Sequence, residues 1–169
     1  MEPDELIRRF AGSPLDFEPR SRWSYSNTGY VILGRVVEKV SGRALSQFLI
    51  DEILVPLGLT HTYYEPDPET PGFARGHTTF ALGPTEKATP EASGWHGGAG
   101  ALYSTAADLA AWDLTLVTGK VLKPASYALM TKLRELDDGR FSWYGCGLSI
   151  SWRNNRVVLT HGGGVAGFA

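Results

Sequence analysis

The chain has 169 residues, of which 43% are hydrophobic and 20% are charged, and its formal net charge at pH 7 is −2. This composition is ordinary for a globular protein, and the charge provides neither a basic surface for nucleic acid nor a polybasic membrane anchor. The single cysteine, Cys146, excludes an internal disulfide, so the sequence favours neither an oxidising nor a reducing compartment.

The N-terminal segment Met1–Glu5 is acidic and no apolar run follows it, so we expect no signal peptide within the chain. No run reaches the length of a transmembrane helix, and we expect no membrane segment. An exported protein would carry its signal upstream of Met1. The sequence therefore leaves both a periplasmic or secreted location and a cytoplasmic one open.

The first part of the chain has the pattern of helices joined by a loop. Pro3–Ala11 is predicted to be a short helix, because proline is tolerated in a first turn and apolar residues share one face. A loop over residues 15–24 follows. Residues 28–40 have the clearest helical periodicity, which Gly42 ends, and a further helix is expected over residues 44–54.

Residues 65–94 lose periodicity and gain Pro, Gly and Thr, which predicts a long loop. Such loops in compact domains usually form binding walls or lids, but the composition of residues 66–71 favours a mobile linker nearly as well. Beyond the loop, Thr105-Ala106-Ala107-Asp108 has the spacing of a capping box and predicts a helix over residues 105–119. Another helix is expected over residues 124–133.

The only clear sheet signal comes last. Every second residue from Cys146 to Trp152 is apolar, Asn154-Asn155 suits a tight turn, and an apolar run returns after it, which predicts a β-hairpin. We therefore predict an α/β (α+β) fold in two parts. A helical and loop region occupies residues 1–142 and antiparallel strands occupy residues 143–169, both within one domain.

Two short motifs are candidates for chemistry. Tyr25-Ser26-Asn27 places a phenol and a carboxamide two residues apart, so on an extended loop they project the same way. A phenol can transfer protons when a neighbouring cation lowers its pKa, and a carboxamide can bind a substrate amide. On these residues alone, helix capping and packing of the Tyr25 ring is the simpler account. The second motif, His161-Gly162-Gly163-Gly164, follows the apolar return strand.

Together the two motifs resemble the second and third signatures of the penicillin-recognising serine hydrolases, which include class C β-lactamases, DD-peptidases and family VIII esterases. Tyr25-Ser26-Asn27 looks like the Tyr-x-Asn signature, and His161-Gly162-Gly163 looks like the His-x-Gly form of the third. The helix pair closed by Pro-Leu-Gly-Leu at residues 56–59 and the glycine turn at residues 97–100 are similar to the same family. The resemblance implies a bacterial serine hydrolase with a β-lactamase/transpeptidase-like fold.

The resemblance also implies roles for individual side chains. Tyr25 would be the general base and later the acid that protonates the leaving group. Asn27 would bind the acyl-side amide or carbonyl and orient the catalytic lysine. His161 would replace the lysine that is usual in the third motif, polarising the site or contacting a substrate carboxylate.

The glycines of the third motif would serve substrate binding. Gly162 and Gly163 would let the substrate backbone approach the strand, and Gly164 would be the oxyanion donor. The resemblance implies no metal and no cofactor, and the partner would be a small-molecule ester, amide or lactam.

The nucleophile of the family is absent, because no serine or threonine in the chain has lysine three residues later. The family places this motif well before the tyrosine, yet only 24 residues precede Tyr25, and the sequence stops at Phe168-Ala169 inside an expected central strand. We therefore expect an interior fragment that is truncated at both ends and inactive alone. Arg20 also departs from the family, which commonly has a glycine turn at this point.

Two functions follow. The first is part of a serine hydrolase that acts through an acyl-enzyme on an ester, a D-amino-acid peptide or a β-lactam. The alternative is a non-catalytic binding or interaction protein built on the same scaffold. In either case, exposed sheet edges of an incomplete domain would favour self-association.

Other candidate sites are weaker. The four histidines show no i, i+4 pair and no adjoining acid, which argues against a metal site; they are His61, His77, His96 and His161. Cys146 alternates with expected core residues and is predicted to be inert. No Gly-x-Ser-x-Gly elbow exists, which argues against an α/β-hydrolase.

Overall fold

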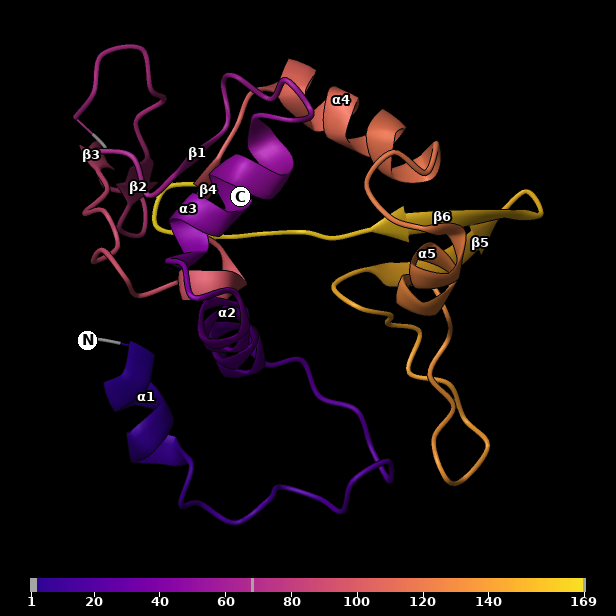
Figure 1. Cartoon of the computed structure of the whole chain (residues 1–169). Helices are drawn as coiled ribbons and strands as arrows, with labels where there is room; N and C mark the ends of the chain where they lie inside the picture. Colours follow the sequence, from indigo (N-terminus) through magenta and orange to yellow (C-terminus); the bar gives the residue numbers. More distant parts are fainter. Residues whose placement is uncertain (1–2, 68, 169) are drawn as a thin grey trace. The chain divides into compact units, whose positions relative to one another are not determined.

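The computed structural model of the chain describes residues 3–67 and 69–168 (Figure 1). The chain divides into two compact units. Unit 1 comprises Met1–Gly12, Ser26–Ala111 and Gly163–Ala169, and unit 2 comprises Ser13–Tyr25 and Trp112–Gly162. The division after residue 142 remains a prediction. The two predicted regions include residues 1, 2, 68 and 169, which lie outside the described part of the chain.

Unit 1 begins with two helices, α1 (Pro3–Phe10) and α2 (Asn27–Ser41). The side chain of Ser26 accepts a hydrogen bond from the N–H three residues later at 3.1 Å and so starts α2. Gly42 ends the helix, because its φ of 69° allows its N–H to bind the carbonyl of Glu38. The predicted helix and its glycine stop are confirmed.

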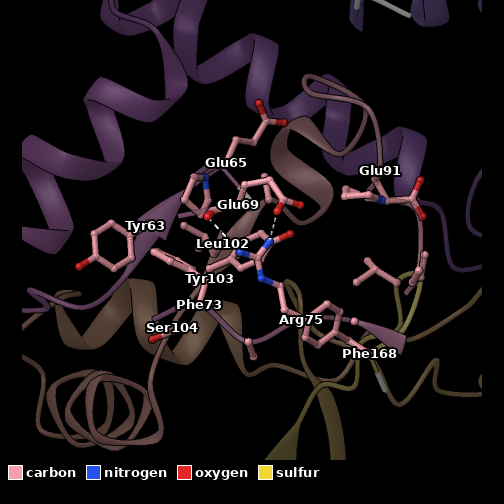
Figure 2. Close-up of a pocket in the computed structure, with 18 of the residues that line it drawn as sticks. Tyr63, Glu65, Glu69, Phe73, Arg75, Glu91, Leu102, Tyr103, Ser104 and Phe168 are labelled. Carbon is pink, nitrogen blue, oxygen red and sulfur yellow. Dashed lines mark hydrogen bonds and ion pairs between the residues drawn. The ribbon is translucent and has the colours of Figure 1, made fainter. Parts of the chain in front are cut away.

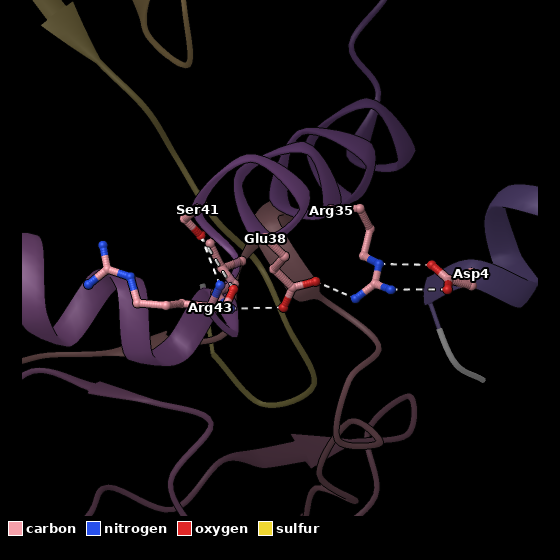
Figure 3. Close-up of polar contacts among 6 residues, drawn as sticks. Asp4, Arg35, Glu38, Ser41 and Arg43 are labelled. Atoms are coloured by element: carbon pink, nitrogen blue, oxygen red, sulfur yellow. Dashed lines mark hydrogen bonds and ion pairs between the residues drawn. The ribbon is translucent and has the colours of Figure 1, made fainter.

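The next helical segment is of two types. Helix α3 (Leu45–Leu49) continues directly as a π-helical turn, η1 (Ile50–Leu54), where a single helix was predicted. Glu38 fixes the start of α3, because its carboxylate accepts a hydrogen bond from the N–H of Leu45 at 2.8 Å. The same carboxylate pairs with Arg35, which binds Asp4 of α1 at 2.8 Å (Figure 3).

Helix α2 packs closely on a 3₁₀ turn, η2 (Gly97–Ala99), because both surfaces present glycine. A Cβ on Gly98 would lie 2.3 Å from the carbonyl oxygen of Tyr30, and a Cβ on Gly34 would lie 3.1 Å from the nitrogen of Gly98. No side chain larger than hydrogen fits at Gly98 without movement of the backbone. The glycine turn thereby brings the segment before α4 onto α2.

Two short sheets complete unit 1. Strand β1 (Tyr63–Tyr64) pairs antiparallel with β4 (Leu102–Tyr103), and β2 (His77–Thr79) pairs antiparallel with β3 (Thr85–Lys87). The β2–β3 hairpin lies within residues 65–94, where a long loop was predicted, so that prediction is wrong in part. Both strands are three residues long and exposed throughout, so no alternation of apolar and polar residues marks them.

Helix α4 (Ala106–Val117) runs from unit 1 into unit 2. Thr105 caps it, because its Oγ1 accepts a hydrogen bond from the N–H of Asp108 at 3.2 Å, as the capping-box spacing predicted. In unit 2, α5 (Pro124–Met130) starts at the predicted proline and ends before the predicted residue 133.

Unit 2 ends in the predicted hairpin, which is confirmed. Strand β5 (Ser149–Arg153) pairs antiparallel with β6 (Arg156–Thr160), and Asn154-Asn155 forms the turn with φ angles of 50° and 58°. Cys146 precedes the strand and is exposed, so the prediction that it alternates with core residues is wrong. Gly147, with a φ of 81°, makes a turn that interrupts the alternation before β5.

Each unit buries a small set of apolar side chains among the described residues. Those of unit 1 are Val31, Leu45, Leu54, Leu59 and Ala88, and those of unit 2 are Leu116, Tyr144 and Ile150. None of the helices in the described residues combines the length and the apolar character that a membrane crossing needs. Many other large apolar side chains are exposed, including four on α2: Ile32, Leu33, Val36 and Val40.

Candidate active site

Three rings meet in unit 2. The centroids of Tyr25 and His161, one from each predicted motif, lie 5.8 Å apart with the rings tilted by 44°. The ring of Tyr144 contacts both edge-on, at 6.0 Å from Tyr25 and 5.9 Å from His161. Tyr25 is 44% exposed whereas Tyr144 is buried, so the cluster presents Tyr25 to solvent over a buried tyrosine.

Both ring nitrogens of His161 have partners. Nε2 lies 2.9 Å from the hydroxyl oxygen of Tyr144, and Nδ1 lies 2.5 Å from the carbonyl oxygen of Gly162. The imidazole is therefore held by a side chain at one nitrogen and by the backbone carbonyl of the next residue at the other.

The loop over residues 15–24 brings Tyr25 to this cluster. Trp23 packs on Tyr144 with ring centroids 5.3 Å apart. Arg20 forms an ion pair with Asp137 at 2.9 Å, and its carbonyl accepts the N–H of Asp137 at 3.1 Å. Arg20 has a φ of 69°, the left-handed conformation that favours glycine. Arg20 therefore has a backbone conformation that glycine adopts more readily, at the position where the family commonly has a glycine turn.

Tyr144 is placed by the glycine that follows it. A Cβ on Gly145 would lie 2.2 Å from the carbonyl oxygen of Met130, so only glycine permits this approach to the end of α5. The same carbonyl accepts the N–H of Cys146 at 2.9 Å. The sequence reasoning missed Tyr144. An aromatic residue directly before two closely spaced glycines was the available signal, because such glycines mark close backbone approach.

The remaining predicted site residues are distributed over the two units. Gly162 ends unit 2, whereas Asn27, Gly163 and Gly164 belong to unit 1. Asn27 is the first residue of α2 and is exposed. A Cβ on any of the three glycines would have no atom beyond its chain neighbours within 4 Å. The structure thus brings Tyr25 and His161 together, and the catalytic roles of all six residues remain predictions.

Within unit 1, the loop after η1 is tied to α4 by a buried carboxylate. Asp108 accepts hydrogen bonds from the N–H of His61 and from Oγ1 of Thr62, both at 2.8 Å. No group of three or more histidine, cysteine or acidic side chains suited to a metal ion occurs among residues 3–67 and 69–168.

Unit 1 also contains a cavity of about 850 Å³ (Figure 2). The rings of Tyr63, Phe73 and Tyr103 line one side of it and contact one another edge-on, with centroid distances of 5.2 and 6.2 Å. Phe168, close after the third motif in sequence, also lines it. This volume suits a small organic ligand, and the lining is rich in apolar groups.

Charged groups form another part of the same cavity. Glu69 pairs with Arg75 at 2.7 Å and with Lys87 at 2.5 Å. The hydrogen bond from Lys87, followed by that from Arg75, holds the pKa of Glu69 below its usual range. Glu65 is held by the hydroxyl of Ser93 and the N–H of Gly94, both at 2.8 Å.

A sequence profile of the family described as Beta-lactamase matches residues 1–169. The chain belongs to the beta-lactamase family. Beta-lactamase family relatives include penicillin-binding protein 4* of Bacillus subtilis, which is 30% identical over 167 residues, covering 90% of this chain and 37% of that protein. A D-aminopeptidase of Brucella anthropi is 26% identical over 171 residues, covering 99% of this chain and 31% of that protein.

Among solved structures, a D-stereospecific amidohydrolase from Streptomyces sp. superposes with a TM-score of 0.82 at 27% identity. The match covers 99% of this chain and 51% of that chain. The chain therefore spans between about a third and a half of the length of these relatives. The predicted β-lactamase/transpeptidase-like fold and the resemblance to the serine β-lactamase and penicillin-binding superfamily are confirmed.

Proposed function

We propose that this chain forms part of a serine hydrolase that acts through an acyl-enzyme on an ester, a D-amino-acid amide or peptide, or a β-lactam. The observation that carries the proposal is the contact between Tyr25 and His161 in unit 2 of a beta-lactamase family chain. The two residues are 136 positions apart in the sequence (161 − 25), and their ring centroids lie 5.8 Å apart in the structure.

In this proposal Tyr25 removes the proton of the attacking serine and later protonates the leaving group. Asn27 binds the acyl-side amide or carbonyl. Gly162 and Gly163 let the substrate backbone approach, and the N–H of Gly164 helps to bind the oxyanion. The space at these glycines supports this role, because no atom beyond the chain neighbours lies within 4 Å of where a Cβ would stand.

The substrate class draws its support from the relatives and from unit 1. A D-aminopeptidase and a D-stereospecific amidohydrolase are among the relatives, which favours an amide of a D-amino acid. Within unit 1, the aromatic side of the cavity would suit a bulky apolar group of a small ligand.

The test uses two polypeptides. The 169-residue chain contains no Ser-x-x-Lys, so we expect it to hydrolyse neither nitrocefin nor a p-nitrophenyl ester. The polypeptide of the complete reading frame should contain Ser-x-x-Lys upstream of Tyr25 and should be labelled covalently at that serine by a fluorescent penicillin or a fluorophosphonate. A burst of product from the 169-residue chain would show that it holds a nucleophile of its own and would contradict the proposal.

The lack of Ser-x-x-Lys among the 169 residues favours a second candidate, a non-catalytic binding protein on the same scaffold. In that case the complete reading frame would also lack the motif. Calorimetry would then detect reversible binding of a D-amino-acid amide, and mass spectrometry would detect no covalent adduct.

A further inference from the structure

The hydrogen bonds of His161 define where the ring carries its proton. Nδ1 faces the carbonyl oxygen of Gly162, and a carbonyl oxygen can only accept a hydrogen bond. Nδ1 must therefore be the donor. In the neutral imidazole, Nε2 then carries the lone pair, and it accepts a hydrogen bond from the hydroxyl of Tyr144 at 2.9 Å.

We propose that Tyr144 is a positioning residue that fixes the tautomer and the orientation of His161 beside Tyr25. The inference deepens the proposed function and rests on it for its catalytic meaning. With both nitrogens engaged by the protein, His161 offers no free nitrogen to a substrate carboxylate. It serves instead as an oriented ring, and proton transfer is left to Tyr25.

Tyr144 is suited to this role because its own position is constrained. Its ring is buried and packs on Trp23, and the close approach of Gly145 to Met130 fixes the backbone beside it. A tyrosine hydroxyl in a buried position needs a hydrogen-bond partner, and Nε2 of His161 provides one. The packed Tyr144 side chain loses little conformational entropy when its hydroxyl binds His161, and this favours a persistent hydrogen bond.

A purely space-filling role for Tyr144 makes a different prediction. The ring would still pack between Trp23 and Tyr25, but the protonated nitrogen of His161 would not depend on the hydroxyl. The tautomer of His161 therefore separates the two roles, and it does not depend on turnover.

The first experiment uses the unmodified 169-residue chain. In ¹⁵N-labelled protein at alkaline pH, long-range ¹H–¹⁵N correlation should show His161 with Nδ1 protonated and Nε2 unprotonated. His61, His77 and His96 provide internal references in the same spectrum. An Nε2-protonated His161 in the unmodified chain would overturn the proposal, whether or not any variant folds.

The second experiment removes only the hydroxyl. Tyr144→Phe should convert His161 from a single Nδ1–H tautomer to a mixture with the Nε2–H form. Tyr127→Phe, a matched substitution on α5 in the same unit, should leave the His161 signals unchanged. An unchanged tautomer in a folded Tyr144→Phe chain would also overturn the proposal. Failure of the complete polypeptide to react with either penicillin or a fluorophosphonate would contradict the proposed function and leave these spectra unaffected.

Discussion

At the scale of single residues, Asp108 is the polar side chain on which unit 1 depends most clearly. It is 8% exposed, and one carboxylate oxygen binds both the N–H of His61 and the hydroxyl of Thr62. Asp108→Ala would leave these donors without their acceptor, at a cost of about 1–3 kcal/mol for an unsatisfied buried group. We expect the free energy of unfolding, measured in urea, to fall by about that amount.

The control for Asp108 lies on the same helix. Asp113 is exposed on α4, and Asp113→Ala should change the free energy of unfolding by less than about 0.5 kcal/mol. Equal changes in the two variants would contradict a stabilising role for the Asp108 hydrogen bonds, because Asp→Ala by itself raises helix propensity.

Tyr25 is the residue whose chemistry is most directly testable. In the polypeptide of the complete reading frame, Tyr25→Phe keeps the ring contact with His161 and removes the hydroxyl that is proposed to transfer the proton. The rate of acylation by a fluorescent penicillin should fall by about 10²–10⁴-fold, the usual contribution of a general base. Tyr127→Phe serves as the control, and an unchanged acylation rate in Tyr25→Phe would exclude the role of general base.

At the scale of elements, the packing of α2 on η2 depends on glycine. A Cβ at Gly98 would stand 2.3 Å from a carbonyl oxygen of α2, so Gly98→Ala must separate the two elements. Overpacking of this kind typically costs about 1–3 kcal/mol, and thermal unfolding should report a lower midpoint. Gly12→Ala has no atom within 4 Å of the added Cβ and should leave the midpoint nearly unchanged.

The β2–β3 hairpin should respond to acid through Glu69. Its pKa is lower in the folded chain than its usual value of 4.5, because Lys87 and Arg75 bind its carboxylate. A lowered folded pKa gives a contribution to stability that is present above the unfolded pKa and is lost as the pH falls through the folded value. The loss of stability below pH 4.5 should therefore be smaller in Glu69→Gln than in the unmodified chain.

Urea unfolding across this pH range measures the effect of Glu69. Glu86→Gln, on strand β3 of the same hairpin, is the matched control and should retain the acid dependence of the unmodified chain. Added salt should reduce the difference in acid dependence between Glu69→Gln and the unmodified chain, because Glu69, Arg75 and Lys87 are all partly exposed.

At the scale of the whole molecule, exposed apolar groups and strand edges should govern behaviour in solution. Within the described residues, strands β5 and β6 form a two-stranded sheet to which β5 adds a single bridge, between Ser149 and Tyr144. Trp152 and Val157 of this hairpin are each about half exposed. We expect sedimentation velocity to show self-association that increases with concentration. Val157→Lys should reduce it, whereas Thr85→Lys adds the same charge to the other exposed hairpin and should not.

The sequence predicted the helices and the hairpin whose local residue patterns match the structure that tertiary packing gives them. The helix over residues 28–40 has both periodicity and a glycine stop, and the hairpin at Asn154-Asn155 has a turn that only a few residue types favour. The contact of Tyr25 with His161 followed from the two motifs through the family resemblance. It did not follow from periodicity or spacing.

The features that the sequence did not predict depend on contacts between residues far apart in the chain, which leave no local pattern. The β2–β3 strands are too short and too exposed to show alternation, and the π-helical turn of η1 has the same apolar pattern as an α-helix. Tyr144 enters the cluster because Gly145 approaches Met130, residues that are separate in sequence. Such a placement is decided by tertiary packing, which a single sequence does not display.

The exposed position of Cys146 has a practical consequence. It is the only thiol in the chain, and it stands two residues after Tyr144 on the turn that approaches Met130. A maleimide fluorophore would therefore attach at one defined point beside the ring cluster. Changes in its emission on adding a D-amino-acid amide would report ligand occupancy in a polypeptide that releases no coloured product.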